Sequence, residues 1–176
     1  MDIEMVILRA LHIALGVFWA GAAFFLASFV VPAVRKGWPP SSAWLQSVIG
    51  PRFQRAVAGS AALTIIAGLR MMWRLSGGFS ASWMTSSTGL CFAIGGLAAI
   101  ASFVIGGSAI GPSATRLIAA LESAERAGAP TERDQNLAVA QAQLGRFTAS
   151  VRAASALLGV AVILMAVARY VSGYAP

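Results

Sequence analysis

The stretch Leu75–Thr115, which reads LSGGFSASWMTSSTGLCFAIGGLAAIASFVIGGSAIGPSAT, contains no Asp, Glu, Lys or Arg. A charge-free run of this length exceeds what a buried helix of a soluble domain needs and is typical of membrane-crossing segments. The whole chain agrees, since 58% of its 176 residues are hydrophobic and 11% are charged, against about 45–50% and roughly 25% in soluble domains. The sequence therefore predicts an all-α, polytopic membrane protein and excludes a soluble globule, a disordered chain and a disulfide-stapled secreted domain.

Four apolar stretches are long enough to cross a membrane at about 20 residues each. We expect the first to end near Val31-Pro32, because a proline and then Arg35-Lys36 follow it. The length of the chain fits one membrane domain. The expected spans are residues 8–33, 52–75, 88–111 and 147–171, and each is bordered by Gly, Pro or Arg.

The connection of residues 113–146 is the most polar segment. Its first half carries apolar residues on one helical face, Gly128-Ala129-Pro130 breaks the chain, and Thr131 with Asp134 forms a capping pair. We expect a helical hairpin at the cytoplasmic surface, whose second helix runs unbroken into the fourth span. It is either a solvated connector or a docking surface for a partner subunit or lipid headgroups.

A weak internal repeat relates the two halves of the chain. Arg52-Phe53 opens the second span and Arg146-Phe147 opens the fourth, while the tetrapeptide of residues 27–30 (ASFV) recurs at residues 101–104. Such self-similarity predicts a four-helix bundle made of two tandem helical hairpins.

Lys and Arg are divided unevenly between the two sides of this layout. Nine of the 13 fall in or beside the first and third connections, which by the positive-inside rule places these connections in the cytoplasm of a bacterial inner membrane and both termini outside it. The net charge of +7 then reflects topology and attraction to anionic membrane lipids. No nucleic-acid partner is expected, since no RNA- or DNA-binding module accompanies the charge. The nine residues are Arg35, Lys36, Arg52, Arg55, Arg116, Arg126, Arg133, Arg146 and Arg152.

His12, the only histidine, lies inside the first span. Helical spacing places Gly16, Trp19 and several alanines on its face, and such small residues direct a face into a helix bundle. Neutral imidazole is an axial ligand of haem iron, and Gly16 would leave room for a flat macrocycle. We therefore weigh haem b binding through His12 against a hydrogen bond from His12 to a neighbouring helix. Another metal, a chlorophyll-type ligand and a proton relay are further alternatives.

Arginines near His12 extend this candidate site. Arg9 lies one turn before it, and Arg70, Arg74 and Arg169 fall on the same predicted side of the membrane. Their side chains either snorkel to the interface or pair with an anionic group such as a haem propionate. With one histidine, the second axial position would hold a methionine, stay open or be completed by a second subunit. The candidate methionines are Met71, Met72, Met84 and Met165.

No acidic residue falls in any expected span, so the sequence offers no paired carboxylates and no His-Cys zinc cluster. This excludes a hydrolase and weakens a proton-coupled transporter. The polar residues inside the spans are hydroxyls, so a small transporter or channel is a third possibility. The competing functional class is a non-catalytic accessory subunit of a larger membrane complex or a homo-oligomer. The hydroxyls are those of residues such as Ser60, Thr64, Ser102 and Ser155.

Residues 8–13 (LRALHI), followed by residues 16–21 (GVFWAG), resemble the opening helix of the bacterial copper-resistance D and HemJ-type membrane families, which begins with a Leu-His pair and a Trp-x-Gly turn. Residues 164–170 (LMAVARY) are similar to the closing helix of uncharacterised relatives. The resemblance implies a four-helix bundle, with His12 at the position for haem b in HemJ-type proteins or for metal in copper-resistance relatives. HemJ-type proteins carry further functional histidines that this chain lacks, so the resemblance implies a membrane redox or metal-related role without a specific enzymatic activity.

Overall fold

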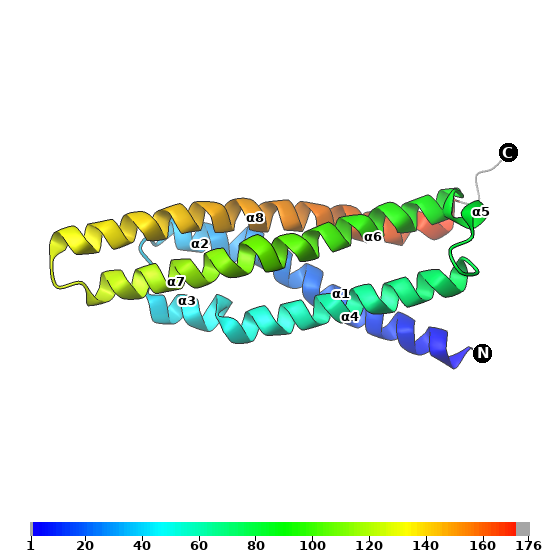
Figure 1. Ribbon diagram of the computed structural model, residues 1–176, viewed down its shortest axis with the longest axis horizontal. Helices are drawn as coiled ribbons and strands as arrows, with labels where there is room; N and C mark the ends of the chain where they lie inside the picture. The colour runs from blue at the N-terminus through cyan, green and yellow to red at the C-terminus, as the bar shows by residue number, and fades with distance from the viewer. Residues whose placement is uncertain (1, 172–176) are drawn as a thin grey trace.

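The computed structural model describes residues 2–171, and these residues form helices and short connections without strands. The helices lie along one long axis, with the start of the first and the end of the last at the same end of the molecule (Figure 1). In chain order they are α1 (Ile3–Phe25), η1 (Leu26–Val30), α2 (Val31–Lys36), α3 (Ser42–Ile49), α4 (Pro51–Leu75), α5 (Ala81–Met84), α6 (Ser87–Ile105), η2 (Gly106–Ile110), α7 (Gly111–Arg126) and α8 (Pro130–Val171).

These elements join into four helical segments that are long and apolar enough to cross a membrane, which confirms the predicted number. Each contains one of the expected spans and extends beyond it, and the fourth confirms that the second helix of the 113–146 connection runs unbroken into the last span. The longest, α8, has 42 residues, or about 63 Å at 1.5 Å per residue, twice the roughly 30 Å of a hydrocarbon core. The segments are Ile3–Lys36, Ser42–Leu75, Ser87–Arg126 and Pro130–Val171.

Two π-helical segments carry the first and third of these helices through a proline. The N–H of Val31 donates to the carbonyl of Leu26, and that of Gly111 donates to the carbonyl of Gly106, so each bond spans five residues instead of four. A proline follows each of these donors, at positions 32 and 112. Proline has no N–H to donate, and its ring clashes with the preceding helical turn. A π segment accommodates both effects without ending the helix. The expectation that the first helix ends at Val31-Pro32 is therefore wrong, because it continues to Lys36.

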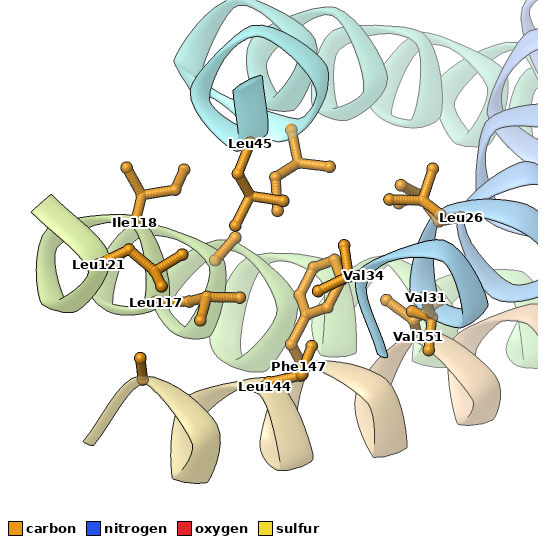
Figure 2. Close-up of a cluster of buried hydrophobic side chains, with 14 of the residues drawn as sticks. Leu26, Val31, Val34, Leu45, Leu117, Ile118, Leu121, Leu144, Phe147 and Val151 are labelled. Atoms are coloured by element: carbon orange, nitrogen blue, oxygen red, sulfur yellow. The ribbon is translucent and has the colours of Figure 1, made fainter. Parts of the chain in front are cut away.

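Side-chain size divides the interior into two clusters. The cluster at the α7–α8 end contains large aliphatic and aromatic side chains, including Leu45, Leu117 and Phe147, each at most 2% exposed (Figure 2). The cluster nearer the middle consists mostly of alanines, such as Ala61 and Ala161, with Trp19 and Leu158. Small side chains let neighbouring helices approach closely, whereas large apolar side chains bury more surface and stabilise a core more strongly.

Hydroxyl groups connect the long helices through neighbouring backbone carbonyls. Ser102 Oγ donates to the carbonyl of Ala154 at 3.1 Å, Ser155 Oγ to that of Ala23 at 3.0 Å, and Thr88 Oγ1 to that of Ala168 at 3.1 Å. Two of these hydroxyls are among those that the sequence singled out, and their bonds join α6 and α1 to α8. In apolar surroundings, such bonds contribute about 0.6 kcal/mol each on average.

A carboxylate from α7 holds the start of α3. The backbone N–H of Ser42 donates to Glu125 Oε1 at 2.8 Å, and Ser42 Oγ donates to Oε2 at 2.5 Å. The side-chain and backbone hydrogen bonds from Ser42 lower the pKa of Glu125 from its ordinary value. A negative charge at a helix N-terminus also interacts favourably with the helix dipole.

This contact predicts an acid-sensitive docking of α3 on α7. Because the folded-state pKa of Glu125 lies below its ordinary value of 4.5, the contact contributes fully above that value and is lost as the pH falls through the lowered pKa. We expect Glu125→Gln to remove this component of the pH dependence of unfolding, measured by thermal melts of both proteins from pH 7 to about pH 3. Identical pH dependence in the two proteins would contradict the assignment.

Candidate functional site

His12 lies on α1 and reaches α4. Its Nδ1 atom is 2.8 Å from the backbone carbonyl oxygen of Thr64. Because a carbonyl oxygen only accepts hydrogen bonds, Nδ1 carries the proton and donates it, so in the neutral ring Nε2 carries the lone pair. A backbone carbonyl on one ring nitrogen is a common way to fix the tautomer of a metal-binding histidine.

The imidazole packs directly on a glycine of α4. A Cβ atom added at Gly68 would lie 2.8 Å from His12 Cε1 and 3.1 Å from Nδ1. Gly16 meets α4 in the same way, since a Cβ there would lie 3.3 Å from the Thr64 Cγ2 methyl. The expected inward face of α1 is thus found against α4, but Thr64 fills the space that Gly16 was expected to leave for a macrocycle.

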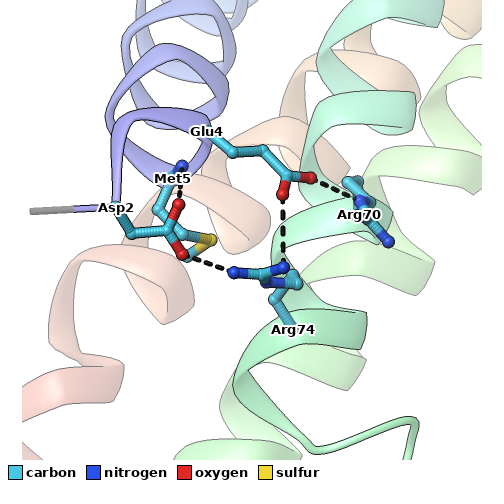
Figure 3. A network of polar contacts seen from close by, with 5 residues as sticks. All are labelled: Asp2, Glu4, Met5, Arg70 and Arg74. Atoms are coloured by element: carbon cyan, nitrogen blue, oxygen red, sulfur yellow. Dashed lines mark hydrogen bonds and ion pairs between the residues drawn. The ribbon is translucent and has the colours of Figure 1, made fainter.

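Four charged side chains link the ends of α1 and α4 (Figure 3). Arg70 Nε is 2.7 Å from Glu4 Oε1, Arg74 Nη1 is 3.2 Å from Glu4 Oε2, and Arg74 Nη2 pairs with Asp2 Oδ2. These side chains are about 40–46% exposed, so solvent screens each pair and its contribution to stability is small. Arg70 and Arg74, the proposed propionate partners, therefore already have carboxylate partners within the chain.

The other predicted site residues are spread over the molecule. Trp19 is 6% exposed and packs edge-on against Phe103 at a centroid distance of 6.5 Å. Arg9 is exposed on α1. Arg169, on α8, stacks over the ring of Tyr170 at 5.7 Å.

Of the candidate axial methionines, Met165 packs on α6. Its Cγ lies 3.4 Å from the position of a Cβ at Gly95. Met71 and Met72, on α4, and Met84, on α5, are partly buried. Within residues 2–171, no group of three or more His, Cys, Asp or Glu side chains is placed to hold a metal ion.

A groove of about 550 Å³ lies further along α1 from His12 and does not include it. Trp19 and Leu26 line it from α1 and η1, Phe53 and Val57 from α4, and Arg116 from α7. Sequence reasoning placed Trp19 on the inward face but missed the groove, because its walls come from four helical segments far apart in the chain.

The ion-pair cluster was also missed, although the sequence contained the signal. Asp2 and Glu4 begin the first helix, Arg70 and Arg74 end the second, and antiparallel neighbours bring those two ends together. No family model, curated protein or solved structure matches this chain. The functional argument therefore rests on the residues themselves.

Proposed function

We propose that the chain is a bacterial inner-membrane protein of two tandem helical hairpins, with both termini outside the cytoplasm, that binds haem b through Nε2 of His12. The observation that carries the haem proposal is the 2.8 Å contact between His12 Nδ1 and the Thr64 carbonyl, which leaves the lone pair on Nε2. Among the described residues, Nε2 has no hydrogen-bond partner. A neutral imidazole nitrogen is the type of ligand atom that haem iron takes, whereas Thr64 fills the space beside Gly16 and leaves no room there for the macrocycle.

The residues around His12 have separate roles in this proposal. The Thr64 carbonyl fixes the tautomer, and Gly68, against the ring, fixes its orientation. Arg9 supports the site as an exposed cation one turn from His12, where a guanidinium can bind a carboxylate through two bonds. Haem would supply one-electron redox chemistry in a membrane redox or metal-related role.

The same contacts support a second candidate, a non-catalytic subunit in which His12 serves only to join α1 to α4. An imidazole that donates to a carbonyl on the next helix and packs on a glycine there is a complete structural contact. In that case the protein's role would be to assemble with a partner membrane subunit or with further copies of itself.

Two substitutions of His12 separate these proposals. In His12→Asn the side-chain amide nitrogen occupies nearly the position of Nδ1, so it can still donate to the Thr64 carbonyl, but no atom replaces Nε2. His12→Ala removes both the hydrogen bond to the Thr64 carbonyl and the candidate ligand atom. Under the haem proposal, the detergent-purified wild type shows a Soret band near one haem per chain and a reduced-minus-oxidised difference spectrum, and both variants lose them.

The stability of the variants completes the test. Because bound haem itself stabilises the folded state, the proteins are compared without haem, where we expect His12→Asn to unfold like the wild type and His12→Ala to lose about 0.6–1.7 kcal/mol, the range for interhelical hydrogen bonds in membrane proteins. Thr88→Val, which removes a different interhelical bond, is the matched control and should keep its haem. A wild type without a Soret band after expression with haem precursor would overturn the haem proposal, and full haem content in His12→Asn would overturn the ligand assignment.

A further inference from the structure

The groove is lined by residues of α1, α4, the η2–α7 segment and α8, and its lining is mostly apolar. Phe53 and Val57 line it from α4, Gly106 and Gly107 from η2, and Trp19 and Leu26 from α1 and η1. Its volume of about 550 Å³ lies in the range of small-molecule binding sites. From Ser102 to Arg116 the lining extends over fourteen residues of helix, or about 21 Å. The lining is thus extended and mostly apolar, as a site for a hydrocarbon chain requires.

The η2 segment keeps the groove open. A Cβ atom added at Gly106 or at Gly107 would meet no atom within 4 Å. These glycines are therefore not required by close helix packing, in contrast to Gly68. Together with the π-helical turn that precedes Pro112, they leave a gap in the wall where most residues would place a side chain. Such π segments occur frequently at functional sites.

Polar groups gather at one end of the groove. Arg116 lines that end, is exposed, and forms no ion pair with the described residues. Gln54 lies nearby; its Nε2 donates to the carbonyl of Ile49 at 2.9 Å, and its Oε1 lies 3.4 Å from the Cβ position of Gly111. No carboxylate of the described residues lines the groove. This end of the groove is therefore cationic.

We propose that this groove binds one acyl chain of an anionic phospholipid, with the lipid phosphate on the Arg116 guanidinium. Arg116 lies five residues beyond the expected third span, about 7 Å along the helix, which is the depth of lipid headgroups on the basic side of the membrane. Guanidinium binds phosphate with charge-assisted, often paired hydrogen bonds. The site uses the four-span placement proposed above but does not depend on haem at His12.

The test compares lipids that share acyl chains and differ in headgroup charge. Delipidated protein in detergent is titrated with phosphatidylglycerol, phosphatidylcholine or inorganic phosphate, and bound lipid is counted by native mass spectrometry. We expect one saturable phosphatidylglycerol, bound about five-fold more tightly than phosphatidylcholine, the contribution of one basic residue near a membrane surface. Inorganic phosphate alone should not compete, because it lacks the acyl chain.

Two variants address the two halves of the site. Arg116→Gln should abolish the preference for phosphatidylglycerol, whereas Arg152→Gln, an exposed arginine on α8 outside the groove, should keep it. Gly106→Leu should weaken the binding of both lipids about tenfold, because the new side chain would displace about two methylene groups of the acyl chain from the apolar groove. Its control is Gly96→Leu, because a Cβ at Gly96 also meets nothing within 4 Å and Gly96 does not line the groove.

Several outcomes would overturn the proposal. Equal binding of the two lipids by the wild type would show ordinary lipid contact without headgroup recognition. Unchanged binding in Gly106→Leu would place the acyl chain elsewhere, and displacement of phosphatidylglycerol by inorganic phosphate at equal concentration would show that the groove adds nothing to binding of the anion. Lipid binding is measured by mass and haem binding by absorbance, so failure of the lipid proposal is distinguishable from failure of the haem proposal. Recovery of the protein without detergent would instead contradict the membrane placement.

Discussion

Leu117→Ala is expected to lower the free energy of unfolding by about 2–5 kcal/mol, the usual cost of truncating a fully buried leucine. Leu117 is 0% exposed in the cluster at the α7–α8 end, where its side chain lies among residues from α2, α3 and α8 (Figure 2). The substitution leaves a cavity there that several helices would have to move together to fill. Reversible unfolding in mixed detergent micelles, followed by tryptophan fluorescence, measures the loss.

Leu97→Ala is the matched control for this experiment. Leu97 lies on α6, is 66% exposed, and faces lipid in the proposed placement. Because most of its surface is exposed, removing its methyl groups deletes little packing within the chain, and the expected change is within about 0.5 kcal/mol. Equal effects of the two substitutions would show that the large-residue cluster does not stabilise the molecule.

The number of long helices could be predicted because hydropathy summed over about 20 residues is a strong local signal. The π-helical segments that interrupt these helices could not be predicted from the sequence. A proline such as Pro32 usually indicates the end of a helix. Here the N–H of Val31 donates to the carbonyl of Leu26, five residues earlier, and the helix continues. Whether a helix ends or adapts at a proline depends on what packs against it, and Leu26, Val31 and Val34 are all buried against other helices.

The candidate site shows the same limit at the level of single residues. The helical wheel of α1 correctly placed His12 and Gly16 on one inward face, since both contact α4. It could not show that Thr64, a residue of another helix, fills the space beside Gly16. Likewise, the sequence left Arg70 and Arg74 either snorkelling to the interface or pairing with an external anion, because their partners, Asp2 and Glu4, are more than 60 residues away in the chain.

Gly68→Ala is expected to destabilise the protein by about 1–3 kcal/mol, the usual cost of adding volume to a tightly packed site. The new methyl group would lie 2.8 Å from His12 Cε1, so α1 and α4 would have to separate or the ring would have to turn away from the Thr64 carbonyl. Gly59→Ala, on the same helix, is the control. A Cβ there meets nothing within 4 Å, and alanine should stabilise the helix by about 0.5–1 kcal/mol.

A double-mutant cycle identifies the cause of the loss. If the clash with the imidazole is responsible, Gly68→Ala should cost much less in a His12→Ala background, because the ring that it meets is gone. An equal cost in both backgrounds would assign the effect to α4 alone and remove Gly68 from the set of residues that orient His12. The same cycle bears on the haem proposal, since a ring displaced by the added methyl group in the single variant should bind haem more weakly without losing its ligand atom. Haem content in Gly68→Ala therefore distinguishes a histidine that must be oriented by α4 from one that only needs to be present.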